Sequence, residues 1–312
     1  MEAVGTPSWK DKVVLITGAN AGLGYQLSLS LASMGAHVVM ACRSPERAER
    51  AHEQLLHEVP GAKATLAPLD VSNPESIRER GALIGARVGH LDLLIHNAGI
   101  FGVPLSRNEA GHELHFATNY LGPFALTGVL LPFFRDAPGS RIVCVGSLSH
   151  RLGKLCIDEL AWREADYKAF AAYARSKLAL LAYTVELDRR LRRRSSNIIA
   201  VGAHPGFAPT DIAKNHAVAN PKTSFGRWVI KRIKASMPTV EQAAAPILYA
   251  ACAEGVRGGE YYGPGGWLEI AGTPAKARVN ARALNADLAL QLWSASEALT
   301  GVRYLSDGST SR

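Results

Sequence analysis

The chain has 312 residues, of which 47% are hydrophobic and 20% charged, a composition typical of a folded globular protein and unlike that of a disordered one. No apolar run approaches the roughly 18 residues that a membrane-spanning helix needs, and the first ten residues carry no secretion signal, so we expect a cytoplasmic protein. The net charge of +8 raises nucleic acid as a partner, but no nucleic-acid-binding motif accompanies it, and we expect no such partner.

Short runs of β-branched and other apolar residues alternate with longer helical patterns along most of the chain. The runs that we predict to be strands are residues 13–17, 38–41, 64–69, 91–96, 141–145 and 197–202. This alternation is typical of repeated βαβ units. The first run, VVLIT, is apolar throughout, as expected where helices cover both faces of a parallel sheet. The sequence therefore predicts an α/β fold, a doubly wound parallel sheet of the Rossmann type.

No repeat or linker divides the chain, so we predict a single domain over residues 11–306, with an N-terminal arm (1–10) and a flexible tail (307–312). Residues 211–238 interrupt the alternation of strands and helices. Within them, residues 225–237 mix apolar and basic side chains, which leaves two interpretations, a lid over the pocket or an amphipathic helix that touches a membrane surface. The position after the sixth predicted strand favours the lid.

A glycine-rich turn joins the first predicted strand to a helical pattern. We expect five of its residues at a cofactor: Gly18, Asn20, Gly22, Leu23 and Gly24. Glycines let the backbone turn tightly and approach a pyrophosphate at the positive end of the following helix. The position after the first strand of a βαβ series favours a dinucleotide site over an ordinary strand-to-helix turn.

The second predicted strand is followed by Arg43, without the acidic residue that usually holds the ribose 2′-hydroxyl of NAD. A guanidinium can bind the 2′-phosphate of NADP through two hydrogen bonds, whereas a carboxylate would repel it. We therefore predict NADP as the cofactor, with NAD as the alternative. This preference rests mainly on the one charge.

Tyr173 and Lys177 are four residues apart in a predicted helix, which places both side chains on one face. Ser147 follows the fifth predicted strand, and Asn119 lies in the helical stretch before that strand. An ammonium about 4 Å from a phenol, at an effective dielectric near 20, would lower the phenol pKa by about three units. We therefore expect Lys177 to bring the pKa of Tyr173 close to working pH.

The spacing of the glycines resembles that of the short-chain dehydrogenase/reductase family, and so do segments after the later strands. Asp70-Val71 resembles its adenine-binding pair, and Asn97-Ala98-Gly99 resembles the end of its Asn-Asn-Ala-Gly motif, with His96 in place of the first Asn. We expect His96 to be a core histidine. The resemblance adds further residues to the expected cofactor site: Asp70, Val71, Asn97, Ala98, Gly99, Tyr173, Lys177, Pro205, Gly206 and Thr210.

The same resemblance implies a catalytic tetrad of Asn119, Ser147, Tyr173 and Lys177. In it Ser147 holds the substrate oxygen, Tyr173 transfers the proton, Lys177 binds the nicotinamide ribose and Asn119 relays protons to solvent. The implied activity is an NADP(H)-dependent oxidoreductase that moves hydride between the nicotinamide and an alcohol or carbonyl compound. The alternative is a non-catalytic dinucleotide-sensing protein on the same fold. The presence of both Tyr173 and Lys177 favours the enzyme.

The 25 residues between Ser147 and Tyr173 must pass close to the substrate. With Arg43, His150 and residues 258–263 and 296–301, this segment resembles the retinol dehydrogenase and WW-domain oxidoreductase branch, particularly its bacterial members. The resemblance implies an apolar substrate, with His150 in the substrate pocket. It also implies a homodimer that pairs through the helices around Asn119 and Tyr173.

His112 and His115 lie three residues apart without further ligands nearby in the sequence, so we expect no metal. The four cysteines are scattered, with no Cys-x-x-Cys pair, and we expect them to be reduced and mostly buried. Five arginines crowd residues 189–194 at the end of a predicted helix. Cations are favourable there, and we expect a solvated charged face.

Overall fold

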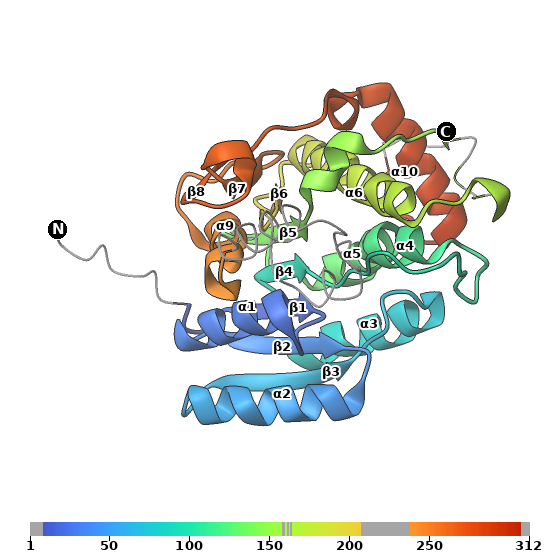
Figure 1. The fold of residues 1–312 in the computed structure, drawn as a ribbon. Helices are drawn as coiled ribbons and strands as arrows, with labels where there is room; N and C mark the ends of the chain where they lie inside the picture. The colour runs from blue at the N-terminus through green and yellow to red at the C-terminus, as the bar shows by residue number, and fades with distance from the viewer. Residues whose placement is uncertain (1–8, 158–159, 161, 163, 207–237, 307–312) are drawn as a thin grey trace, which may run out of the picture.

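The computed structural model describes residues 9–157, 160, 162, 164–206 and 238–306, which form one central sheet covered by helices on both faces (Figure 1). The strands are β1 (Val13–Thr17), β2 (His37–Cys42), β3 (Lys63–Pro68), β4 (Leu93–His96), β5 (Arg141–Val145), β6 (Ile199–Ala203), β7 (Tyr261–Pro264) and β8 (Pro274–Lys276). They pair in the order β3-β2-β1-β4-β5-β6-β7-β8, and all these pairs are parallel except β7–β8. The predicted doubly wound Rossmann-type sheet is confirmed.

All six predicted strands are present, with ends that differ from the prediction by at most two residues. Strands β7 and β8 were not predicted, because runs of four and three residues carry too little pattern to be distinguished from a loop. The strand order reverses between β1 and β4. In open α/β sheets ligands bind at this reversal, beyond the carboxyl ends of the strands.

The longer helices are α1 (Gly22–Ser33), α2 (Pro45–Glu58), α3 (Pro74–Val88), α5 (Gly122–Leu130), α6 (Ala169–Arg193), α9 (Val240–Cys252) and α10 (Ala286–Thr300). The short helical turns are α4 (Leu114–Phe116), the π-helical η1 (Ala117–Leu121), and the 3-10 turns η2 (Leu131–Phe133), η3 (Leu148–Leu152), η5 (Glu164–Asp166), η6 (Trp267–Glu269) and η7 (Ala281–Leu284). Within the described residues, no helix combines the length and apolar character needed to cross a membrane.

Two apolar cores lie on the opposite faces of the sheet. Val13 and Leu15 of β1 belong to the core that packs under α3, α5 and α6, and Val14 and Ile16 belong to the core under α1, α2 and α9. Because successive strand side chains point to opposite faces, β1 must be apolar at every position. This explains the run VVLIT and confirms the buried parallel sheet that it predicted.

The domain begins slightly before the predicted boundary. The Trp9 side chain is 7% exposed and belongs to the core beside α1, and its backbone N–H donates to the Met34 carbonyl at 3.0 Å. Trp9 thus packs with the domain, although the prediction assigned it to the arm (1–10). Residues 1–8, the predicted tail (307–312) and all of the predicted lid except Pro238 lie outside the described residues.

The C-terminal helix α10 packs against α6 (Figure 1). Trp293 stacks on Tyr183 of α6 with ring centroids 5.8 Å apart, and Ser296 Oγ lies 2.5 Å from the Tyr120 hydroxyl. Further along, the Tyr304 ring lies 5.1 Å from Phe124 of α5. The chain's own C-terminus thus occupies part of the surface that we expected to form a dimer interface. A homodimer stays a prediction.

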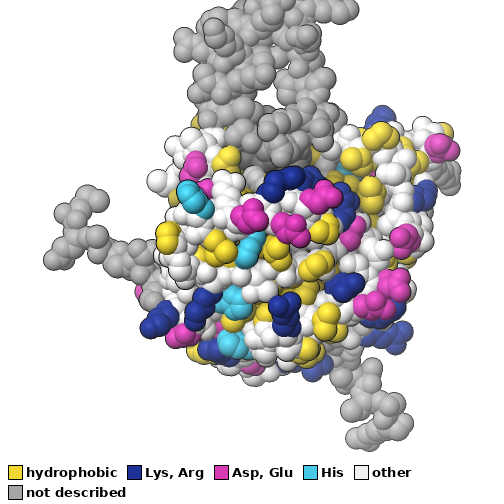
Figure 2. Space-filling model, turned by 90° about the horizontal axis from the view of Figure 1, so that it is seen from below, with side chains coloured by type: hydrophobic (Ala, Val, Ile, Leu, Met, Phe, Trp, Pro, Cys, Tyr) yellow, Lys and Arg dark blue, Asp and Glu magenta, His cyan; other side chains and the backbone are white. Residues whose placement is uncertain are grey.

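The arginine run at the end of α6 is only partly a solvated face, so that prediction is wrong for some of its members. Arg190 is 5% exposed, lies 4.2 Å above the Trp293 ring and donates to Glu186 at 2.8 Å. Arg192 pairs with Asp188 of the same helix. These charges fasten α10 and the loop before β7 to α6. On the face seen in Figure 2, basic and acidic side chains are interspersed, so the net charge does not gather there.

All four cysteines are free. Cys42 and Cys144 are buried and Cys252 is half-buried, whereas Cys156, in the segment between η3 and η5, is exposed. Burial, expected for most of the cysteines, is thus complete for Cys42 and Cys144 and partial for Cys252.

Candidate active site

A cleft of about 700 Å³ opens at the carboxyl ends of β1, β2, β4, β5 and β6. It is lined by nearly all of the residues that the sequence placed at a cofactor or a substrate: Gly18, Asn20, Gly22, Leu23, Gly24, Arg43, Asp70, Val71, Asn97, Ala98, Gly99, Ser147, Tyr173, Lys177, Pro205 and Gly206. Of the remaining predicted residues, Asn119 lies behind the cleft wall and Thr210 lies outside the described residues. The structure thus brings residues separated by almost 190 positions into one site.

The glycine turn packs closely against the start of α1. Gly18 has φ +66°, a conformation that favours glycine, and a Cβ at Gly24 would lie 2.2 Å from the Gly18 carbonyl oxygen. The Asn97 side chain donates to the Thr17 carbonyl at 2.9 Å, which ties β4 to this turn. No side chain caps the first turn of α1, so its backbone N–H groups stay available to an anion.

We expect Gly24→Ala to weaken NADPH binding by at least about tenfold. The added methyl group would overlap the Gly18 carbonyl, at a cost of about 1–3 kcal/mol, and relieving this overlap must move the Gly18 backbone. Isothermal titration with NADPH measures the change. Ser33→Ala, at the far end of the same helix, should leave the dissociation constant unchanged. Equal binding by Gly24→Ala and the wild type would contradict the close packing at this turn.

The end of the cleft beside β2 has a second arginine that the sequence prediction missed. Arg43, Ser44 and Arg47 all line the cleft, and Arg43 Nε lies 4.0 Å from Asp70 Oδ2. Pro45 begins α2, so Arg47 follows Arg43 by four residues at the start of a helix. The available signal was the position of Arg47 in the first turn of the helix that directly follows β2, because ligands bind beyond the carboxyl ends of the strands.

Four side chains lie near the floor of the cleft. Tyr173 and Lys177 face it from α6, and Ser147 reaches it from the end of β5. Asn119 lies in η1 and is 1% exposed; its Oδ1 accepts from the Ile100 N–H at 2.8 Å, and its Nδ2 donates to the Ile100 carbonyl and to Ser176 Oγ at 3.0 Å each. Its side chain therefore holds the backbone of the loop after β4.

Lys177 and Asn119 converge on the same backbone position. A Cβ added at Gly99 would lie 3.2 Å from Asn119 Oδ1 and 3.5 Å from Lys177 Nζ. A glycine at this position keeps the space between the two polar groups open.

The comparisons with known proteins agree with this geometry. The family model described as short chain dehydrogenase matches residues 12–220. The chain belongs to the short-chain dehydrogenase family. It is 34% identical over 298 residues to human retinol dehydrogenase 13, an alignment that covers 93% of this chain and 85% of the relative. The enzyme class and the retinol dehydrogenase branch predicted from the sequence are thereby confirmed.

Solved structures are similar over most of this dehydrogenase. An uncharacterised protein from Mycobacterium paratuberculosis superposes with a TM-score of 0.78 at 33% identity, covering 96% of this chain and 97% of the other. A short-chain dehydrogenase from Burkholderia cenocepacia in complex with NADP has a TM-score of 0.63 at 25% identity, covering 81% and 96%. A nicotinamide cofactor is the ligand that this family membership supports.

Burial governs the pKa values of both Tyr173 and Lys177. Burial raises the pKa of Tyr173, and hydrogen bonds from Ser147 and Ser149 offset this only in part. Burial also lowers the pKa of Lys177 to about 8. Lys177 Nζ donates to the Val145 carbonyl at 2.8 Å and lies 5.9 Å from the centre of the Tyr173 ring. The expected lowering of the tyrosine pKa is not found in this structure, because desolvation of the phenol outweighs the hydrogen bonds from Ser147 and Ser149.

The two histidines singled out from the sequence are both buried. His96 is 2% exposed, its Nε2 lies 2.8 Å from Thr127 Oγ1, and burial lowers its pKa to about 3, so the prediction of a core histidine is confirmed. His150 is fully buried, with Nδ1 2.6 Å from the Ser147 carbonyl oxygen and its ring 5.2 Å from Tyr261. The prediction that His150 lines the pocket is wrong, because it packs behind Ser147 instead.

The substrate end of the cleft is apolar. Phe101 follows β4, and Leu148, Leu152 and Phe170 come from the segment between Ser147 and Tyr173, which therefore lines the cleft. The Phe101 ring lies 4.6 Å from the Tyr173 ring, at an interplanar angle of 64°. Leu152 is 69% exposed and Phe170 48%, so these two side chains form the open rim.

Proposed function

We propose that this protein is an NADP(H)-dependent oxidoreductase that transfers hydride between the nicotinamide and an apolar alcohol or its carbonyl product. The observation that carries the proposal is one cleft with three parts: the glycine turn at α1, the arginines Arg43 and Arg47, and Tyr173 beside apolar side chains. The name of the relative retinol dehydrogenase 13 supports an apolar alcohol as substrate.

The residues fit a dinucleotide. The open space beside Gly22 and the uncapped start of α1 suit a pyrophosphate, and two guanidinium groups at the end of β2 suit a 2′-phosphate. Lys177 would hold the nicotinamide ribose. When bound, the cofactor supplies or accepts the hydride.

The protein's own part is to hold the substrate oxygen and to move a proton. The Ser147 hydroxyl donates a hydrogen bond to the substrate carbonyl oxygen. The Tyr173 hydroxyl then gives its proton to that oxygen as the carbonyl carbon is reduced, and takes a proton in the reverse direction. Burial raises the pKa of Tyr173, so the phenol begins the carbonyl reduction in its protonated form.

The cofactor preference is tested by removing the two arginines. Arg43→Ala and Arg47→Ala should each lower the kcat/KM ratio of NADPH to NADH by about tenfold, and the double variant by about a hundredfold, because a hydrogen bond to a charged group contributes about 1.5–3 kcal/mol. Arg50→Ala, also exposed on α2 but away from the cleft, is the control. An unchanged ratio in the double variant would show that the arginines do not read the 2′-phosphate.

The activity itself is tested by following NADPH oxidation with a panel of hydrophobic aldehydes and ketones. Turnover of these compounds supports the proposal. Tight NADPH binding without turnover of any of them would support the second candidate, a dinucleotide-sensing protein. That candidate is disfavoured because Tyr173 and Lys177 both line the cleft. The cytoplasmic location stays a prediction.

A further inference from the structure

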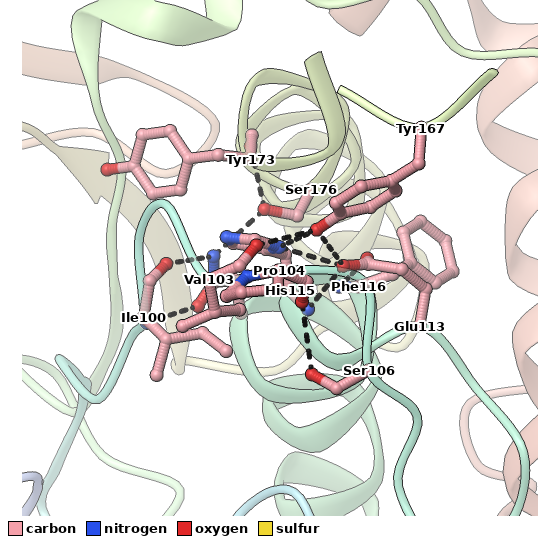
Figure 3. Close-up of polar contacts among 11 residues, drawn as sticks. Ile100, Val103, Pro104, Ser106, Glu113, His115, Phe116, Tyr167, Tyr173 and Ser176 are labelled. Carbon is pink, nitrogen blue, oxygen red and sulfur yellow. Dashed lines mark hydrogen bonds and ion pairs between the residues drawn. The ribbon is translucent and has the colours of Figure 1, made fainter. Parts of the chain in front are cut away.

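Two separate segments of the chain form the substrate end of the cleft. The loop after β4 contributes Phe101, and the segment that leads into α6 contributes Phe170; their rings lie 6.3 Å apart. Tyr167 joins the two segments (Figure 3). Its hydroxyl donates to the Val103 carbonyl oxygen at 3.0 Å, and it lies 3.2 Å from Glu113 Oε1 and 3.1 Å from His115 Nδ1.

Glu113 anchors this contact. Its carboxylate accepts from the backbone N–H groups of His115 at 3.0 Å and Phe116 at 2.8 Å, and it lies 2.7 Å from His115 Nδ1. Burial raises the pKa of Glu113, but these hydrogen bonds more than compensate, and the pKa is lowered. Glu113 therefore stays ionised at the start of the helical stretch that carries Asn119.

His115 connects the cluster to the catalytic tyrosine. Its ring is fully buried and lies 6.3 Å from the Tyr173 ring at an interplanar angle of 69°. Within the described residues, its Nε2 is buried without a hydrogen-bond partner. In Figure 3 the Tyr173 hydroxyl points away from this cluster, so the cluster contacts the ring and does not reach the reacting atoms.

We propose that Tyr167 is a positioning residue that, through Glu113 and Val103, fixes the spacing between the Phe101 loop and the start of α6 and so determines the shape of substrate that the cleft accepts. The inference rests on the proposed function, because it concerns the substrate end of the same site. A second link between the segments, from Arg107 Nη2 to the Trp162 carbonyl at 2.9 Å, is exposed. Water competes at that position, so Tyr167 is the stronger connection.

Tyr167→Phe removes the hydroxyl and keeps the ring. Without the hydroxyl, the Phe101 loop and the start of α6 are free to separate. The kcat/KM of bulky substrates should therefore rise relative to that of slender ones. For a linear and a cyclic aldehyde of equal carbon number, we expect the kcat/KM ratio to shift toward the cyclic compound by about fivefold or more, since a mispositioned wall of this kind changes discrimination by about 1–3 kcal/mol. The shift should appear in KM, with kcat and the NADPH dissociation constant nearly unchanged.

Tyr25→Phe is the matched control, because it also removes one tyrosine–glutamate hydrogen bond, to Glu58 at 3.0 Å, and neither residue lines the cleft. Glu113→Gln keeps the shape of the side chain without its charge and should shift the ratio in the same direction; it serves if Tyr167→Phe does not fold. An unchanged ratio in the folded variant, or an equal shift in Tyr25→Phe, would overturn the inference.

Unreactive amides of the same two shapes separate this inference from the proposed function. Their dissociation constants, measured by calorimetry with NADP present, should show the same relative shift in Tyr167→Phe. If the wild type turns over neither aldehyde, the proposed function is wrong, and the binding ratio of the amides still decides the role of Tyr167.

Discussion

Tyr173→Phe is expected to lower kcat for carbonyl reduction by about a thousandfold or more, with the NADPH dissociation constant changed by no more than about twofold, because a positioned proton donor contributes about 10²–10⁴ in rate. Tyr173 is the acidic group that faces the cleft beside Ser147, and the phenylalanine ring keeps its contacts with Phe101 and His115. Single-turnover measurements with saturating NADPH report the chemical step directly.

Tyr183→Phe on the same helix provides the control. The Tyr183 hydroxyl bonds to that of Tyr304 at 3.0 Å and lies away from the cleft, so this variant should keep nearly full kcat. A Tyr173→Phe enzyme with more than about a tenth of the wild-type kcat would show that another group supplies the proton, since a tenfold loss is below the usual range for general acid catalysis.

Much of this fold and site could be predicted because the signals are local. Strands β1 and β2 are buried on both faces, so they appear in the sequence as apolar runs, and the glycines that follow β1 mark a turn with a specific backbone shape. Residues that come directly after a strand end must meet at one edge of a parallel sheet. This rule, together with the resemblance to the short-chain dehydrogenase family, predicts that Asp70, Asn97 and Ser147 meet, and all three line the cleft.

The features that could not be predicted depend on contacts between distant segments. Tyr167 and Glu113 are 54 positions apart, and nothing near either residue in the sequence indicates their contact. The burial of Arg190 depends on Trp293, which lies in α10, more than a hundred residues further along the chain. The prediction for the Tyr173 pKa failed for a related reason. The direction of its shift is determined by desolvation, which a sequence motif does not reveal.

Lys177→Met is expected to lower kcat/KM by at least about a hundredfold while making the protein more stable at pH 7, since function often requires groups that folding disfavours. Lys177 is 4% exposed, and its pKa falls from 10.5 to about 8 because burial disfavours the ammonium. A shift of one pKa unit corresponds to about 1.4 kcal/mol, so keeping Lys177 charged lowers the free energy of unfolding by about 3 kcal/mol. Methionine is similar in size and carries no charge, but it loses the hydrogen bond to the Val145 carbonyl, which contributes about 1 kcal/mol.

The pH dependence gives this prediction its sign. The unfolded chain binds the lysine proton more tightly than the folded protein, so the cost is fully present below pH 8 and disappears as the pH rises to about 10.5. In urea denaturation, Lys177→Met should therefore exceed the wild type by about 1–2 kcal/mol at pH 7, and the difference should vanish or reverse by pH 10. Lys63→Met, at an exposed position of β3, should show no such crossing. A contradicting result would be a Lys177→Met protein that is less stable than the wild type by the same amount at pH 7 and pH 10. The surroundings of Lys177 would then stabilise its charged form, and burial of the ammonium would not lower the free energy of unfolding.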